Sequence, residues 1–317
     1  MKAKMTSLPL PKLVAVVGPT ASGKTDLAVA LAKKYKGEII SADSRQFYRG
    51  TEIGSDIVAG KWVRRCGRRT YVAHGVPHHL IGFLPPSELF TVAQFKDHVI
   101  RIAGDIAKRG RLPILAGGTG LYLKAVIDNY SIPEVAPHPA FREKMEKKTT
   151  AALFKLLQKK DSAYAARIPA NNRRYAIRAL EVMSATGQTV TESQKQGDPL
   201  FDVLQIGIQR PREAMYERIN ARVDAMMKKG LLKEAQKLGK KYGWDVPAMS
   251  GLGHRQLGAY LRGETTLAEA VDQIKTGTRH FAKRQNTWFK RDSRIKWVKS
   301  EAEAARLVKR FLNKNAL

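Results

Sequence analysis

The sequence predicts an α/β fold, in which helices flank a parallel sheet and an all-helical insertion domain interrupts the chain. Three observations predict this class. A glycine-rich turn joins a short apolar run to a helical pattern, two more apolar runs of strand length follow, and the middle of the chain shows helical patterns alone. Continuous apolar runs of this length are typical of strands buried on both faces of a parallel sheet.

Strand and helix patterns alternate through the first part of the chain. Short apolar, β-branched runs predict the strands, and apolar residues at helical spacing predict the helices. We expect strands at 13–17, 38–42 and 112–116, and helices at 25–35 and 90–108. Between them, several Gly, Pro and Arg residues indicate a loop-rich excursion over 60–86.

The pattern changes after residue 127, where proline and asparagine breaks separate amphipathic helical stretches. An alternating run at 203–208 then predicts a strand that returns to the sheet. We expect helices at 140–160, 161–168, 172–186, 212–229, 231–242, 266–290 and 301–313. The predicted domains are a catalytic α/β core, formed by 1–127 and 200–317, and a helical insertion domain at 128–199.

The composition indicates a polyanionic partner. The 317 residues include 57 Lys and Arg against 28 Asp and Glu, a net charge of +29 with a pI near 10.3. No helical pattern combines a long basic face with a purely apolar one, which favours nucleic acid over a membrane surface. The single cysteine, Cys66, excludes an internal disulfide, and no apolar run approaches the ~18 residues that cross a bilayer. With no signal-peptide pattern at the N-terminus, we expect a cytoplasmic protein.

The glycine-rich turn matches the phosphate-binding pattern G-x-x-x-x-G-K-[ST]. Its residues are Gly18, Pro19, Thr20, Ala21, Ser22, Gly23, Lys24 and Thr25. In such a P-loop the glycines let backbone N–H groups curve around phosphate oxygens, and the following helix adds its positive dipole end. The lysine supplies a point charge, and the threonine hydroxyl of residue 25 can ligate a Mg²⁺ ion that bridges the phosphates.

One carboxylate follows a predicted strand near this loop. An ordinary P-loop NTPase has an Asp after a later strand, but the strand at 112–116 ends in Gly117-Gly118-Thr119-Gly120. Asp43 instead follows the second strand, where substrates bind in such sheets. An Asp-Ser pair also often caps a helix or turn, so position alone leaves both roles open for Asp43.

The chain resembles the bacterial tRNA dimethylallyltransferases, also called tRNA isopentenyltransferases. The resemblance rests on GPTASGKT at 18–25 and on several further segments that together span nearly the whole chain. These are DSRQ at 43–46, PHHL at 77–80, GGTGLY at 117–122, RALEV at 178–182, ERINARVDAM at 217–226 and TRHFAKRQNTWFK at 278–290.

The resemblance implies transfer of a dimethylallyl group from its diphosphate to N6 of the adenosine 3′ of the anticodon in tRNA. In this family pattern, Asp43 matches the general base, and Thr20 and Arg222 match residues that contact the diphosphate, with Mg²⁺ at Thr25. The P-loop anion would then be the leaving diphosphate, whose developing charge it stabilises. Reaching N6 requires the base to leave the anticodon stack.

The resemblance also implies contacts with the tRNA anticodon stem-loop. The matching positions are Asp43, Ser44, Arg45, Gln46, Thr119, Arg142, Arg173, Arg174, Gly253, His254, Arg255 and Arg284. Asn172, Tyr175 and His254 depart from the family pattern. Phe281 and Trp288 lie in a basic, aromatic segment typical of RNA binding. Their helical spacing is, however, more often that of core residues.

Other classes of function remain open at this stage. A P-loop small-molecule kinase could also carry an acid after its second strand, but it would gain nothing from the +29 charge. An AMP prenyltransferase would not need the insertion or the basic C-terminal helices, and a non-catalytic RNA-binding module would not need the P-loop. His74, His78 and His79 could suggest zinc, yet no Cys or nearby carboxylate completes a site. We expect a monomer.

Overall fold

The computed structural model describes residues 9–65, 67–193 and 196–314, so the expectations for Cys66 and for the N-terminal segment 1–8 lie outside the described residues. The chain forms two compact units. Unit 1 comprises Met1–Phe90, His98–Leu123 and Leu200–Leu317, and unit 2 comprises Thr91–Asp97 and Lys124–Pro199. Within the described ranges, no helix has the length and apolar character needed to cross a membrane.

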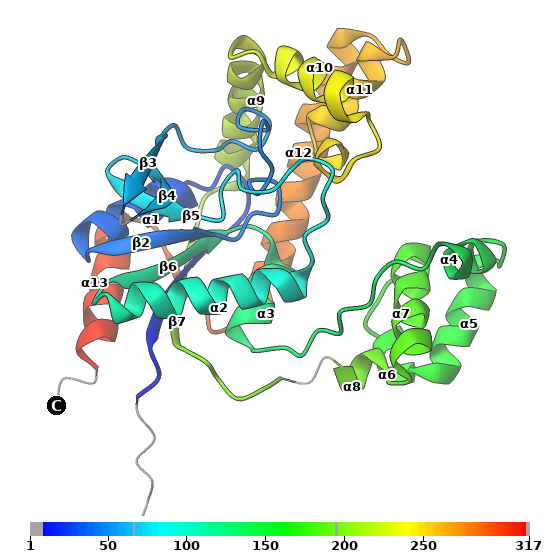
Figure 1. The fold of residues 1–317 in the computed structure, drawn as a ribbon, viewed down its shortest axis with the longest axis horizontal. Coiled ribbons are helices and arrows are strands. Elements are labelled where there is room, and N and C mark those ends of the chain that lie inside the picture. The colour runs from blue at the N-terminus through cyan, green and yellow to red at the C-terminus, as the bar shows by residue number, and fades with distance from the viewer. Residues whose placement is uncertain (1–8, 66, 194–195, 315–317) are drawn as a thin grey trace, which may run out of the picture. The chain divides into compact units, whose positions relative to one another are not determined.

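Unit 1 is built on a sheet that has eight strands within the described residues, in the order β3-β4-β5-β2-β6-β1-β7-β8 (Figure 1). The strands are β1 (Lys12–Val17), β2 (Gly37–Ser41), β3 (Lys61–Arg65), β4 (Arg68–Ala73), β5 (Val76–His79), β6 (Leu112–Gly117), β7 (Asp202–Ile208) and β8 (Lys296–Val298). All pairings from β5 to β8 are parallel, which confirms the predicted parallel sheet. Strand β1 lies between β6 and β7, with Val14 opposite both Ile114 and Leu204.

The expectation of a loop-rich excursion over 60–86 is wrong. This segment forms β3, β4 and β5, in which β3 pairs with β4 and β4 with β5, both antiparallel. Between β4 and β5, His74 and Gly75 have φ values of 51° and 79°, as in the two-residue turns that suit a hairpin. Two of the glycines that suggested irregular chain, Gly67 and Gly75, therefore lie between the paired strands of two hairpins.

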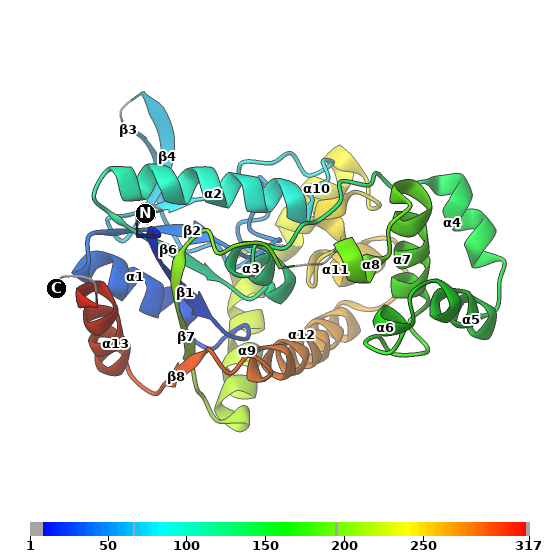
Figure 2. The same ribbon diagram turned by 90° about the horizontal axis from the view of Figure 1, so that it is seen from below.

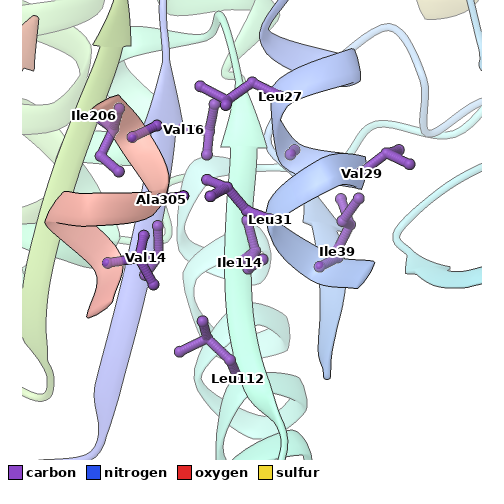
Figure 3. Packing of buried hydrophobic residues seen from close by; sticks show 14 of the residues in the cluster. Val14, Val16, Leu27, Val29, Leu31, Ile39, Leu112, Ile114, Ile206 and Ala305 are labelled. Atoms are coloured by element: carbon purple, nitrogen blue, oxygen red, sulfur yellow. The ribbon is translucent and has the colours of Figure 1, made fainter. Parts of the chain in front are cut away.

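The core of unit 1 lies between the sheet and two helices, α1 (Lys24–Lys34) and α13 (Glu301–Asn313). Figure 3 shows Leu27 and Leu31 of α1 packed over Ile114, with Ala305 of α13 beside Val14 on the same face. Because these side chains are almost fully buried, the strand that precedes the P-loop and the helix that follows it are held rigidly together.

The other helices of unit 1 form the opposite side of the sheet and a helical group beyond its end (Figures 1 and 2). They are α2 (Val92–Lys108, in this unit from His98), α3 (Gly120–Ile127, to Leu123), α9 (Arg212–Lys228), α10 (Leu231–Tyr242), α11 (His254–Leu261) and α12 (Leu267–Lys290), with the 3₁₀ turn η1 (Pro247–Ser250). A shared apolar cluster, which includes Val223, Leu231, Leu257 and Ile274, joins α9 to α12. The sequence patterns predicted neither α11 nor β8.

Unit 2 has a separate apolar core, in which Leu153, Leu157, Ala176 and Leu180 are buried. Its helices are α4 (Pro139–Glu146), α5 (Thr150–Lys160), α6 (Ser162–Ala165), α7 (Arg173–Thr186) and α8 (Val190–Ser193). The helix predicted over 140–160 is two helices, because the Thr149 hydroxyl accepts a hydrogen bond from the Ala152 N–H at 3.2 Å and caps α5.

A buried carboxylate lies near the amino end of β2, at the end of the parallel strands opposite the P-loop. Glu38 on β2 is 3% exposed and accepts hydrogen bonds from Arg109 and from His79 Nε2 at 2.8 Å, with Arg111 Nε at 3.5 Å. Burial alone would raise the pKa of Glu38, but the hydrogen bonds from His79 and Arg109 outweigh it and hold the pKa at about 2. The carboxylate therefore stays ionised in the folded protein well below its usual pKa of 4.5.

We predict that Glu38→Gln lowers the free energy of unfolding at pH 7 by about 2 to 3 kcal/mol, because Arg109, Arg111 and His79 lose a buried anionic partner. The folded-state pKa is depressed, so this contribution is present above pH 4.5 and is lost as the pH falls towards 2. Urea unfolding across this range should therefore show the two proteins converging in stability. The exposed pair of Arg262 with Glu264 supplies the control, since Glu264→Gln should change little at any pH. A constant difference between Glu38→Gln and the wild type would contradict the assignment.

Candidate active site

The P-loop has the backbone geometry of an anion cradle. Gly18 and Gly23 have φ values of 149° and 95°, in the region that favours glycine, and Ala21 lies at 62°. Gly23 is the left-handed residue before α1, so the helix begins at Lys24 and its N-terminal N–H groups face the loop. The burial of β1 and α1 holds both ends of the loop, which can therefore present a fixed set of donors.

Three arginines from later in the chain form hydrogen bonds with the P-loop. Arg210 Nε donates to the Ser22 carbonyl at 2.5 Å, and Arg218 Nε donates to the Ala21 carbonyl at 3.1 Å. Since a trans peptide points its N–H away from its C=O, the bond to Ser22 turns the Gly23 N–H towards the other side of the loop. Sequence reasoning missed Arg210 and Arg218, because it could not show that β7 lies next to β1.

Arg222 is the third of these arginines, and it lies on α9. The adjacent face of this helix is buried, which fixes the helix and therefore the position of Arg222. Its Nη2 donates to Thr20 Oγ1 at 2.7 Å, and its Nη1 pairs with Asp56 Oδ2 at 3.0 Å. Its Nε is buried without a hydrogen-bond partner among the described residues. An unsatisfied donor on a charged group indicates that this guanidinium can bind a further anion. The structure thus brings Thr20 and Arg222 together, and it adds Asp56, which the sequence did not indicate.

Lys24, the lysine of the P-loop, is half-buried, and its Nζ donates to the Pro19 carbonyl at 3.4 Å. Burial lowers the pKa of the Lys24 ammonium, and the positive charge of Arg222 lowers it further. The negative charges of Asp43 and Asp56 act in the opposite direction. Asp43 therefore lies within electrostatic range of the P-loop lysine, so one site holds the phosphate-binding loop and a carboxylate.

Asp43 lies at the carboxyl end of β2, where its carboxylate folds back on the chain. Asp43 Oδ1 accepts a hydrogen bond from the Arg45 N–H at 3.0 Å, as in an Asx turn. Its Oδ2 has no hydrogen-bond partner within the described part of the chain. The half-buried carboxylate is thus held in position by one oxygen, which leaves the other able to accept a proton from a bound molecule.

Strand β6 lies between β1, which leads into the P-loop, and β2, which leads into Asp43. Glycines let the three chain segments approach each other across this strand. A Cβ on Gly117 would lie 2.3 Å from the Ala42 carbonyl oxygen, and one on Gly118 would lie 3.3 Å from the Gly18 carbonyl oxygen. Only glycine fits at Gly117, since real Cβ atoms do not approach an oxygen so closely.

The residues after Asp43 are held by neighbouring segments of the chain. Thr119 Oγ1 accepts a hydrogen bond from the Ser44 N–H at 3.3 Å, and Gln46 Oε1 accepts one from the Ser41 hydroxyl at 2.8 Å. Arg45 Nη1 donates to the Pro247 carbonyl at 3.1 Å and to Ser250 Oγ at 3.0 Å. This segment therefore lies beside both the 117–120 loop and η1.

His254 is placed differently from a residue that stacks on an RNA base. Its side chain is 3% exposed, and its Nε2 lies 2.9 Å from Glu234 Oε1. The same carboxylate accepts the N–H groups of Ile53 and Gly54 at 2.8 and 2.9 Å. His254 therefore helps to hold the 53–54 loop, and its neighbour Gly253 is also buried, whereas Arg255 is exposed.

In unit 2, two of the three expected RNA-binding arginines are bound within the unit. Arg142 forms two 2.8 Å hydrogen bonds with the carboxylate of Glu181, which is 2% exposed. Burial alone would raise the pKa of Glu181, but hydrogen bonds, with Arg142 first among them, hold it at about 2. Arg173 donates to the Lys148 and Glu146 carbonyls, whereas Arg174 is exposed.

The basic helix α12 presents one aromatic residue outward. Trp288 is 44% exposed, so the expectation that it belongs to the core is wrong, and Phe289 is buried instead. Trp288 packs against Gly120, where a Cβ would lie 2.2 Å from its Nε1. Arg284 is exposed on the same helix and lies over the half-buried ring of Phe281 at 5.9 Å.

The parallel sheet and the loop between β1 and α1 define a P-loop protein of the α/β class. The family model described as IPP transferase matches residues 46–292, which is more than half of the chain. The tRNA dimethylallyltransferase of Roseiflexus sp. strain RS-1 is 42% identical over 312 residues, which cover 95% of this chain and 99% of that protein. The chain belongs to the IPP transferase family.

Two crystal structures resemble the fold. The full-length tRNA isopentenylpyrophosphate transferase of Bacillus halodurans is 38% identical, with a TM-score of 0.68 and coverage of 96% of both chains. A eukaryotic dimethylallyltransferase acting on tRNA is 24% identical, with a TM-score of 0.78 over 96% of this chain and 80% of that one. The second likeness bears on the fold alone.

We predict that Gly117→Ala destabilises the protein by about 1 to 3 kcal/mol, because its Cβ must displace the Ala42 carbonyl or the end of β6. Chemical denaturation measures this change. Gly104 in α2 is the matched control, since a Cβ there meets nothing within 4 Å. Gly104→Ala should stabilise the helix by up to about 1 kcal/mol. A Gly117→Ala protein as stable as the wild type would contradict the close approach of β6 and β2.

Proposed function

We propose that the protein transfers a dimethylallyl group from dimethylallyl diphosphate to N6 of the adenosine 3′-adjacent to the anticodon in tRNA, releasing diphosphate. The observation that carries this proposal is the pairing, in one unit, of an anion-binding loop with the Asp43 carboxylate, one oxygen of which has no hydrogen-bond partner among the described residues. The activity named for the relatives of this chain agrees with it.

The donor diphosphate would lie in the P-loop, with Lys24 and the Arg222 guanidinium on its charged oxygens. The Thr20 hydroxyl accepts from Arg222, so its own proton is free to be donated to the donor. Negative charge grows on the diphosphate as the allylic C–O bond breaks. Donors aimed at that charge stabilise the transition state more than the ground state.

Asp43 would act on the acceptor as general base. The N6 amine of adenine is a poor nucleophile, because its lone pair is delocalised into the ring. As the N6–C bond forms and the C–O bond breaks, the amine proton passes to Asp43 Oδ2 and the electron pair of the C–O bond leaves with the diphosphate. The Arg45 N–H on Oδ1 keeps the carboxylate oriented for this transfer.

The residues present fit a Mg²⁺ ion that is bound mainly through the diphosphate. Thr25 lies in the first turn of α1, where its hydroxyl can ligate the ion. Within the described residues, no group of three or more His, Cys, Asp and Glu side chains is arranged to hold a metal. Few protein ligands and several phosphate or water ligands are what Mg²⁺ usually accepts. The bound ion would neutralise charge on the diphosphate.

The tRNA would be bound by exposed basic side chains, with the target base flipped out of its stack. Arg174, Arg255 and Arg284 are exposed, and the +29 charge supplies a long-range attraction. Arg142 and Arg173 would contribute by shaping unit 2. We propose that the protein acts as a monomer, since the P-loop, Asp43 and Arg222 all come from one unit of one chain. We also propose that it acts in the cytoplasm, where tRNA is available.

A mixture of the protein, tRNA, Mg²⁺ and labelled dimethylallyl diphosphate, without ATP, tests the function directly. We expect label in the RNA, on the adenosine next to the anticodon. Label on AMP but not on an anticodon stem-loop would favour the AMP prenyltransferase alternative. Phosphoryl transfer from ATP to a small molecule, with no label in RNA, would favour a kinase.

Asp43→Asn should lower kcat by about 10²- to 10⁴-fold, because the amide cannot accept the N6 proton. Binding of inorganic diphosphate should stay within about threefold of the wild type, since Asp43 does not contact it in this scheme. Single-turnover kinetics and calorimetry measure the two effects. Asp272→Asn, which changes an exposed acid on α12, is the control. A fully active Asp43→Asn protein would remove the general base from the scheme.

Thr20→Ala and Arg222→Ala should each slow transfer by about 10²- to 10³-fold and weaken diphosphate binding, with tRNA affinity nearly unchanged. The physical reason is that both side chains face the anion and are joined by a 2.7 Å hydrogen bond. Arg262→Ala removes an exposed arginine far along the chain and should leave all three quantities unchanged. A defect confined to tRNA binding would show that Thr20 and Arg222 are misassigned.

A further inference from the structure

Gln285 is a buried amide on α12 that joins two loops of the active site. It is 7% exposed. Its Oε1 accepts a hydrogen bond from the Thr20 N–H at 2.8 Å, and its Nε2 donates to the Gly118 carbonyl at 2.8 Å. The orientation of the amide follows from its partners, because a backbone N–H can only donate and a carbonyl can only accept.

We infer that Gln285 is a positioning residue, which sets the distance between the donor and acceptor sites of the proposed prenyl transfer. This inference rests on the proposed function. In this scheme Gln285 itself contacts neither substrate. The residue acts through Thr20 on one side and through the 117–120 loop on the other.

On the donor side, Gln285 and Arg222 hold the backbone N–H and the side-chain oxygen of Thr20. The amide binds the backbone N–H, and the guanidinium binds the side-chain oxygen at 2.7 Å. The backbone N–H of Thr20 is therefore not among the P-loop donors that face an anion. With both groups bound, the hydroxyl proton has a restricted direction, so the donor oxygen that it can reach is also restricted.

On the acceptor side, Gln285 holds the loop after β6, which is hydrogen-bonded to the residues on both sides of Asp43. Gly118 directly precedes Thr119, whose N–H donates to the Ala42 carbonyl at 3.2 Å. The Thr119 hydroxyl oxygen accepts from the Ser44 N–H at 3.3 Å. A movement of Gly118 would therefore pass to the residues on both sides of Asp43.

The site requires a glutamine at 285 and a glycine at 118. Asparagine is one methylene shorter, and glutamate cannot donate to the Gly118 carbonyl when ionised. A Cβ on Gly118 would lie 2.3 Å from Gln285 Nε2 and would push the amide away. Gly118→Ala is therefore a second, independent way to disturb the same connection.

The first test is a steady-state comparison of Gln285→Met with wild type. Methionine keeps the volume and loses both hydrogen bonds, so kcat should fall by about 10²-fold, the loss that an ångström of misplacement can cause. Dissociation constants for inorganic diphosphate and for an anticodon stem-loop should stay within about threefold. Gly118→Ala should show the same pattern.

Gln205 supplies a matched control, since it is a buried glutamine of similar exposure on β7 whose amide faces Asp292. Gln205→Met should lower the melting temperature about as much as Gln285→Met while leaving kcat unchanged. A similar loss of kcat in both variants would reduce Gln285 to a general contributor to stability and overturn the inference.

The Gln285→Glu variant adds a pH signature that a purely structural role would not produce. An ionised carboxylate repels the Gly118 carbonyl, whereas a protonated one can donate to it. The ratio of variant to wild-type kcat should therefore rise as the pH falls, and the same ratio for Gln285→Met should not. Two parallel pH profiles would overturn the inference.

A last measurement separates this inference from the proposed function, because it needs no turnover. Hydrogen exchange of peptides that cover 18–25 and 117–120 should speed up in Gln285→Met and Gly118→Ala but not in Gln205→Met. Unchanged exchange in both peptides would overturn the positioning role even if prenyl transfer is confirmed. If the variants show this exchange pattern but the wild-type protein transfers no label, the function alone would be overturned.

Discussion

The active site depends on the close approach of three backbone segments at the carboxyl end of the sheet. Strand β6 lies between β1, which leads into the P-loop, and β2, which leads into Asp43. Larger residues at positions 117 and 118, at the end of β6, would push the ends of β1 and β2 away. Gly117 and Gly118 remove this obstacle, because they let carbonyl groups of Ala42 and Gly18 come within contact distance. The P-loop and Asp43 can then share one site although their strands are not adjacent.

Positive charge around the P-loop has a second effect besides attracting anions. Arg210 and Arg218 bind carbonyl oxygens of the loop, which holds its peptide planes with N–H groups turned the other way. Burial disfavours the charged form of Lys24, and Arg222 adds to this, so the nearby carboxylates of Asp43 and Asp56 offset part of the cost. A bound diphosphate would offset more, which makes the anion part of the electrostatic balance of the site.

The arginines of this basic chain perform different tasks that their residue type does not reveal. Arg142 and Arg173 are bound to a carboxylate and to carbonyls inside unit 2, so their charges serve packing. Arg174, Arg255 and Arg284 are exposed and can attract RNA phosphates. His254 matched an RNA-contact position in the sequence, yet it is buried against Glu234. A local pattern cannot distinguish these cases, because burial and partners depend on residues far away in the chain.

The sequence by itself determined the features that depend on neighbouring residues. The buried strand, the P-loop and the helix after it follow from apolar patterning and glycine spacing over about twenty positions, as does the separate run of helices between residues 128 and 199. Only the tertiary structure decided the strand order, the three hairpin-linked strands in 60–86, and the partners Arg210, Asp56 and Gln285. The physical reason is distance along the chain: Gln285 lies 265 residues from Thr20, and packing of the whole unit brings them together.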